Sequence, residues 1–93
     1  MARPKKERNI CQRAPYECFK PNGVPISQLD KVELLDEEFE ALRLADLEDL
    51  SQAAAAASMG VSRQTFGNIV KCARAKVAQS LVHGQALMLN RES

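Results

Sequence analysis

The chain has 93 residues, of which 45% are hydrophobic and 27% charged, and it contains no Trp. A chain of this length forms at most one domain, with a core too small for a deep catalytic pocket. No apolar run approaches the ~18 residues of a membrane span, and the basic start lacks the hydrophobic core of an export signal. Three cysteines, an odd number, without an export signal favour reduced thiols and a cytoplasmic protein.

The net charge of +1 hides a segregation of charge along the chain. The balance of basic over acidic side chains is 6 − 2 = +4 in residues 1–20, 2 − 9 = −7 in residues 30–50, and 5 − 1 = +4 in residues 51–93. A partner that touches only the two ends meets a basic surface, which attracts a polyphosphate. The charges alone leave open the alternative of solvated faces and a basic tail.

Residues 1–29 are expected to form a basic, proline-containing arm with little regular structure. All four prolines lie in it. Pro21-Asn22-Gly23 is a turn signal, because Pro fixes φ and Gly accepts a positive φ. The run Tyr16–Phe19 suits one short extended piece before that turn.

Residues 30–93 are expected to form a compact, all-α, three-helix domain. Helical periodicity begins near Leu34, and Asp36 is the predicted N-cap. Glu37 and Glu38 follow where the helix dipole favours negative charge. The apolar positions expected on one face of this helix, or on the stripe beside it, are Leu35, Phe39, Leu42, Leu44 and Leu47.

Two further helices are predicted after residue 50. Ser51 is expected to cap a short, alanine-rich helix from Gln52 to about Met59. Gly60 ends that helix, and Ser62 caps a third helix that runs to about Leu81. The apolar stripe of the third helix consists of Phe66, Ile69, Val70, Ala73, Val77 and Leu81. The tail from Val82 to Leu89 fits a short strand and a frayed end equally well.

The sequence around Gly60 has the pattern of a helix-turn-helix, placed at about residues 51–81. This motif needs a connection of three or four residues between two steeply crossing helices. A glycine there permits a left-handed backbone, and the small Ala56 lets the second helix approach. Two amphipathic helices that only meet at a glycine would share the apolar stripe, but they would not require Ala56, Gly60 and Val61 together. The pattern therefore predicts the motif.

In a helix-turn-helix, the first turns of the second helix enter the major groove of DNA. Arg pairs with guanine, Gln and Asn pair with adenine, and Ser, Thr and backbone N–H groups suit phosphate. A glycine in the helix is expected to leave room for the groove wall. Cations farther along the helix and in the arm are expected to touch the DNA backbone. No acidic side chain occurs between Asp49 and Glu92. The predicted DNA-binding residues are Ser62, Arg63, Gln64, Thr65, Gly67, Asn68, Lys71 and Arg74, with Arg3, Lys5, Lys6 and Arg8 from the arm.

Several segments carry a resemblance to a known family. They are Arg3-Pro-Lys-Lys6 with Arg8, Phe19-Lys-Pro21 with Gly23 and Pro25, Glu40–Asp46, Met59–Phe66, and Ala73-Arg74. On these segments, nearly the whole chain resembles an uncharacterised prokaryotic family of small predicted DNA-binding proteins, whose domain is similar to region 4 of sigma-70-type transcription factors. The resemblance implies a compact helical fold and DNA binding, and it implies no target gene, ligand or catalytic activity.

Catalytic and metal-binding functions are not expected. His83 is the one histidine, and a lone histidine is more often an exposed residue than a base. Cys11 and Cys18 do not form the closely spaced pair that zinc sites prefer, and Cys72 is expected on the apolar side of its helix. We therefore predict no catalytic residue, no metal ligand and no cofactor.

The sequence thus predicts a cytoplasmic, sequence-specific binder of double-stranded DNA, a transcriptional regulator, and not an enzyme or a membrane protein. The competing hypothesis is a protein-interaction module of the transcription machinery that uses the acidic segment 30–49. Its partner would be RNA polymerase or another protein. The oligomeric state stays open, with a homodimer as one option.

Overall fold

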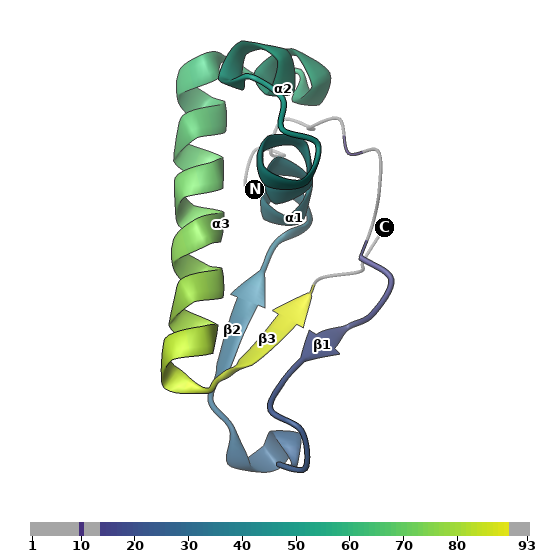
Figure 1. The fold of residues 1–93 in the computed structure, drawn as a ribbon, viewed down its shortest axis with the longest axis vertical. Coiled ribbons are helices and arrows are strands. Elements are labelled where there is room, and N and C mark those ends of the chain that lie inside the picture. Colours follow the sequence, from purple (N-terminus) through teal and green to yellow (C-terminus); the bar gives the residue numbers. More distant parts are fainter. Residues whose placement is uncertain (1–9, 11–13, 90–93) are drawn as a thin grey trace, which may run out of the picture.

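The computed structural model describes residue 10 and residues 14–89, and it consists of three α-helices beside a small sheet (Figure 1). The expectation of an all-α fold is therefore wrong. In chain order the elements are β1 (Cys18–Phe19), the 3-10 turn η1 (Ile26–Gln28), β2 (Lys31–Leu34), α1 (Asp36–Leu42), the π-helical segment η2 (Arg43–Leu47), α2 (Gln52–Met59), α3 (Arg63–His83) and β3 (Ala86–Leu89). The predicted contacts Arg3, Lys5, Lys6 and Arg8 lie outside the described residues.

The sheet has the strand order β1-β3-β2, so the last strand lies between the other two. β3 is antiparallel to β1, with Cys18 opposite Met88, and parallel to β2, with Leu34 opposite Leu89. β2 forms because its four residues alternate between exposed and buried, which is the period of a strand and not of a helix. The tail is thus a strand, and Cys18–Phe19 from the expected arm belongs to the sheet. The turn predicted at Pro21 is confirmed by Gly23, whose φ is 81°.

α1 begins one residue earlier than expected. Leu34 ends β2, and Leu35, not Asp36, is the N-cap. A leucine side chain cannot accept a hydrogen bond, and the helix is capped from the other direction: the backbone N–H of Leu35 donates to Oε1 of Glu38 at 2.8 Å. This is the half of a capping box in which the third helical residue reaches back to the N-cap. Glu38 is therefore buried, although it belongs to a strongly acidic segment.

The chain widens into the π-helical turn of η2 directly after α1. The N–H of Glu48 donates to the carbonyl of Arg43 at 2.8 Å, five residues back. Arg43 also donates from Nε and Nη2 to the two carboxylate oxygens of the fully buried Glu40, at 2.9 Å each. The turn directs Leu44 into the core but leaves Leu47 76% exposed. The expected apolar positions are therefore confirmed for Leu44, and for Phe39 and Leu42, which pack against buried core residues, but not for Leu47.

Two apolar clusters hold the elements together, and α3 contributes to both. The first joins α1, η2, α2 and the first half of α3, and consists of Ala41, Leu44, Ala55, Ala56, Met59, Phe66, Ile69 and Val70. The second joins the sheet to the middle of α3 and consists of Ala14, Leu34, Ala73 and Leu89. In Figure 1, α2 lies across one end of α3, and the sheet lies beside the other half of that helix. None of the described helices is both long and apolar enough to span a membrane.

Candidate nucleic-acid interface

The connection between α2 and α3 has the backbone that its sequence predicts. Gly60 has φ 70° and ψ 33°, the left-handed conformation, so this expectation is confirmed. The N–H of Gly60 donates to the carbonyl of Ala57 at 3.1 Å, and the N–H of Val61 donates to that of Ala56 at 3.0 Å. These bonds satisfy carbonyls that a helix end leaves without partners. The chain therefore passes from one helix to the next within the three residues Gly60–Ser62.

Small side chains allow α2 to lie close against α3. Ala55, Ala56 and Met59 are at most 2% exposed and belong to one cluster with Phe66 of α3. A larger side chain at Ala56 would push the two helices apart, because a close-packed interior has no spare volume. The prediction that Ala56 is a buried small residue in this corner is confirmed.

Both predicted serine caps are present. Oγ of Ser51 accepts from the N–H of Ala54 at 3.1 Å, and Oγ of Ser62 accepts from the N–H of Thr65 at 3.0 Å. The Ser62 hydroxyl also donates to Oγ1 of Thr65 at 2.9 Å. The N–H groups of the first two residues of α3 have no partner inside the helix, as at the start of any helix. They lie at the surface of the molecule.

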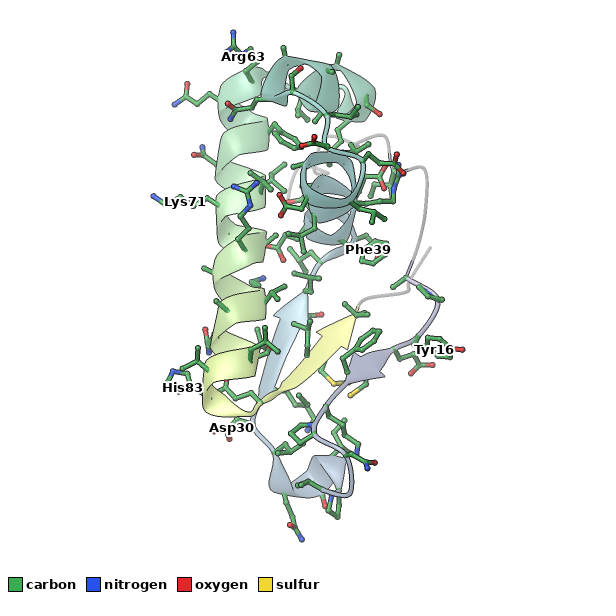
Figure 2. All side chains as sticks on the ribbon, viewed as in Figure 1. Tyr16, Asp30, Phe39, Arg63, Lys71 and His83 are labelled. Atoms are coloured by element: carbon green, nitrogen blue, oxygen red, sulfur yellow. The ribbon has the colours of Figure 1, made fainter. Side chains whose placement is uncertain are left out.

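The exposed face of the first half of α3 is polar and carries no carboxylate. Gln64, Asn68 and Lys71 recur at the spacing of one helix face and are all exposed, as is Arg63. The opposite face is buried in the core through Phe66 and its neighbours. Figure 2 shows Arg63 at the end of α3 and Lys71 directed away from α1. The fold therefore presents these four predicted contact residues together.

Gly67 does not lie in open space as expected. It is half-buried, and a Cβ at this position would come within 2.6 Å of Nε2 of Gln52. The missing side chain thus makes room for the start of α2. Gln52, which the sequence analysis did not select, lies beside the exposed face of α3. The signal for it was the glycine itself, since a glycine inside a helix often marks a close approach.

Arg74 is bound by a carboxylate from another element. Its Nε donates to Oδ2 of Asp46 at 3.1 Å, and its Nη2 donates to Oδ1 at 2.7 Å. Both side chains are about half exposed, at 54% and 46%. The hydrogen bonds with Arg74 hold the pKa of Asp46 below its usual value and raise the pKa of the guanidinium. Sequence reasoning missed Asp46 because 28 residues separate the partners.

Four of the nine acidic side chains in residues 30–49 form ion pairs within the described part of the chain. Glu38 accepts from Nζ of Lys76 at 2.8 Å, Glu40 and Glu48 bind Arg43, and Asp46 binds Arg74. These bonds engage Arg43 of the segment itself and two cations of α3. Arg63 and Lys71, in contrast, form no ion pair within residues 10 and 14–89.

Cys72 lies on the exposed side of α3, which corrects the expectation that it faces the core. A hydrogen bond with Glu38 raises the pKa of its thiol, which disfavours the thiolate. A protonated thiol is a poor nucleophile and a poor metal ligand. Among the described residues, no three His, Cys, Asp or Glu side chains are grouped as metal ligands would be, while Cys11 lies outside those residues.

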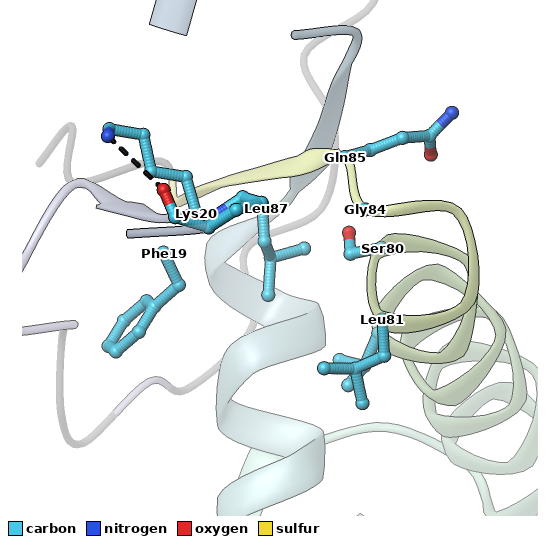
Figure 3. A pocket seen from close by; sticks show the side chains of 9 residues that line it. Phe19, Lys20, Ser80, Leu81, Gly84, Gln85 and Leu87 are labelled. Carbon is cyan, nitrogen blue, oxygen red and sulfur yellow. Dashed lines mark hydrogen bonds between the residues drawn. The ribbon is translucent and has the colours of Figure 1, made fainter. Parts of the chain in front are cut away.

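An apolar groove of about 290 Å³ lies at the opposite end of α3. Figure 3 shows its lining, in which Phe19 and Leu81 are prominent. Leu81 is 79% exposed, so the buried stripe of α3 ends before it. Lys20 is the one charged residue of the lining, and its ammonium donates to the carbonyl of Val24 at 2.7 Å. This groove has the wrong chemistry for a polyanion and is not part of the candidate interface.

The comparisons with known proteins agree with the resemblance at the level of the family. Residues 1–92 match the family described as "Protein of unknown function DUF134". The chain belongs to the DUF134 family. It is 67% identical over 92 residues to a UPF0251 protein of Vibrio parahaemolyticus, and the match covers 99% of this chain and 96% of the relative. UPF0251 proteins of Aeromonas salmonicida and Shewanella halifaxensis are 57% and 55% identical over 89 residues, covering 96% of this chain and 87% and 93% of their own lengths.

Membership in a prokaryotic family is thus confirmed for this DUF134 chain. The names of the relatives state nothing about what these proteins bind. No solved structure matches the chain significantly.

Proposed function

We propose that α2 and α3 form a helix-turn-helix, similar to that of sigma-70 region 4, which binds double-stranded DNA sequence-specifically, and that the protein is a transcriptional regulator. The observation that carries this proposal is the exposed face of α3. It combines Arg63, Gln64, Asn68 and Lys71 on a helix without a single carboxylate side chain. These side chains have the donors and acceptors that read guanine and adenine edges or bind phosphate.

The arrangement of α2 and α3 also supports the proposal. α2 lies across the start of α3 and is joined to it by three residues, which leaves the first turns of α3 prominent at one end of the molecule. A helix must protrude in this way to enter a major groove about 12 Å wide. The uncapped N–H groups at the start of α3 add a favourable position for phosphate.

The competing hypothesis, protein binding through residues 30–49, has weaker support. Of its nine acidic side chains, Glu38 and Glu40 are buried, and Asp46 is bound to Arg74. A partner that used them would have to break existing ion pairs. DNA binding needs no such change, because Arg63 and Lys71 are already exposed.

The test is a salt titration of binding to a mixed pool of labelled duplexes by fluorescence anisotropy. DNA binding predicts that log affinity falls linearly with log salt, with a slope of about −0.9 for each phosphate contacted. Lys71→Ala should weaken binding to all sequences and reduce the slope by about 1. Lys20→Ala is the matched control, because it removes the same charge at the groove beyond the opposite end of α3. Binding that is absent, or insensitive to salt, would contradict the proposal.

A further inference from the structure

Arg74 and Asp46 form an arrangement that the base-reading face does not include. Arg74 follows Arg63 by eleven residues, close to three whole turns, so both lie on nearly the same side of α3. The axial distance between them is about 16 Å. A major groove is about 8.5 Å deep. Because about 16 Å exceeds this depth, Arg74 lies outside the groove, on the side of the phosphates, when the Arg63 end of α3 reaches the base edges.

The ion pair uses only part of the hydrogen-bonding capacity of Arg74. A guanidinium has five N–H donors, and Asp46 accepts from Nε and from one N–H of Nη2. The three other N–H groups, two of them on Nη1, have no hydrogen-bond partner in the described part of the chain. More than half of the side chain is exposed, so a phosphate can reach these donors while Asp46 keeps its own bonds.

Asp46 is itself held in place. It lies in the π-helical turn η2, which is closed by the bond between Glu48 and Arg43 and anchored by the buried Leu44. π-helical turns of this kind occur frequently at functional sites. A long, flexible arginine thus gains a fixed direction from a neighbouring element that is packed into the core.

We propose that Asp46 is a positioning residue, which orients Arg74 to bind a phosphate of the DNA backbone beside the groove that α3 enters. This inference rests on the proposed DNA binding and adds to it a specific phosphate contact and its support. The contact contributes affinity without sequence preference, because phosphates are the same at every base pair. The ordering of Arg74 before binding avoids an entropy cost that a free arginine would incur on the DNA.

The alternative is that Asp46 competes with DNA for Arg74. Its carboxylate would then repel the phosphate and weaken DNA binding. The two roles predict opposite signs for the same substitution. If Asp46 positions Arg74, Asp46→Ala weakens DNA binding by about two- to tenfold, the range for ordering one long side chain. If Asp46 competes, Asp46→Ala strengthens binding.

The experiment measures affinity and salt slope for the full chain and four variants on random-sequence duplexes. We expect Arg74→Ala to weaken binding and reduce the salt slope by about 1. Asp46→Ala should weaken binding less, and the double variant should bind like Arg74→Ala alone, because Asp46 acts only through Arg74. Asp49→Asn is the matched control: it removes the same charge three residues away, at a positive φ that Asn tolerates, and should not weaken binding.

The outcomes separate the inference from the proposed function. Wild-type protein without salt-sensitive DNA binding overturns both. Wild-type binding with Asp46→Ala equal or tighter overturns the positioning role alone, as does an additive double variant. A thermal melt of each protein checks the fold. If Asp46→Ala is unfolded, Asp46→Asn takes its place. The inference is supported if Asp46→Asn binds DNA more weakly than wild type and has no further effect in the Arg74→Ala background. Wild-type affinity of Asp46→Asn overturns it.

Discussion

Replacing Gly60 should destabilise the fold, and the size of the effect should depend on how well the new residue tolerates a left-handed backbone. At φ 70° and ψ 33°, a residue with a Cβ loses about 1–2 kcal/mol. Alanine recovers about 0.4–1 kcal/mol of this by restricting the unfolded chain, so Gly60→Ala should lower the free energy of unfolding by about 1 kcal/mol. Asn tolerates this conformation and should cost less, whereas the β-branched Val should cost about 2 kcal/mol or more.

Thermal melts followed by circular dichroism measure this series directly. For a domain of this size, 1 kcal/mol corresponds to a shift of about 4–8 °C in Tm. Gly84→Ala should behave like Gly60→Ala, because Gly84 has φ 65° and open space around it. Ala57→Val, in the exposed part of α2, controls for β-branching alone and should cost only about 0.6 kcal/mol. A Gly60→Val protein that melts with wild type, or a Gly60→Asn protein less stable than Gly60→Ala, would refute the argument.

Three further predictions concern the arm, the ion pair and the caps. Deleting residues 2–8 should weaken binding to specific and random duplexes by similar factors and flatten the salt slope, and unchanged affinity in the same titration would show that the arm makes no DNA contact. The lowered pKa of Asp46 means that its pair with Arg74 stabilises the fold above about pH 4 and ceases to do so as the pH falls through the folded-state pKa. The stability difference between wild type and Asp46→Asn, roughly 0.2–1 kcal/mol at pH 7 for so exposed a pair, should therefore vanish in acid, and a difference constant down to pH 2 would contradict this. Ser62→Ala should cost about 1 kcal/mol in urea unfolding by loss of the cap, whereas Ser58→Ala, within α2, should cost almost nothing.

Local signals sufficed to predict the helical half of the fold. Ser51, Gly60 and Ser62 mark the bounds of α2 and the start of α3, and each acts through bonds to residues within five positions. Such signals are legible because cap and turn chemistry depends on the nearest residues only. The face of α3 followed from the same periodicity, which is why Arg63 and Lys71 were placed correctly on the exposed side.

The sheet was missed because its pairing is not local. β2 has only four residues, a pattern too short to indicate a strand, and its last residue, Leu34, coincides with the point where the helical periodicity begins. Its partner β3 lies more than fifty residues farther along the chain, so nothing near Leu34 indicates the pairing. The error at Asp36 follows from the missed strand: β2 ends at Leu34, so Leu35 becomes the N-cap, and the side chain of Glu38 binds its N–H.

The missed parts of the candidate site are also tertiary contacts. Asp46 meets Arg74 across 28 residues, and Gln52 meets the backbone of Gly67 from the neighbouring helix. The sequence predicted which residue types line α3, but the assignment of each cation required knowing which carboxylates face it. Lys76 illustrates this: it binds the buried Glu38 and is not available to a polyanion.

The central claim is that the first turns of α3 read the edges of base pairs. Selection of bound fragments from a randomised duplex library, with wild type, Arg63→Ala and Gln64→Ala in parallel, tests it most directly. We expect that wild type enriches one motif and that each variant loses preference at one or more positions, at a cost of about 1–3 kcal/mol on the preferred site. Gln79→Ala, four turns farther along the same helix, should keep the wild-type motif. If the wild type enriches no sequence, or both variants keep its full preference, then α3 does not read DNA.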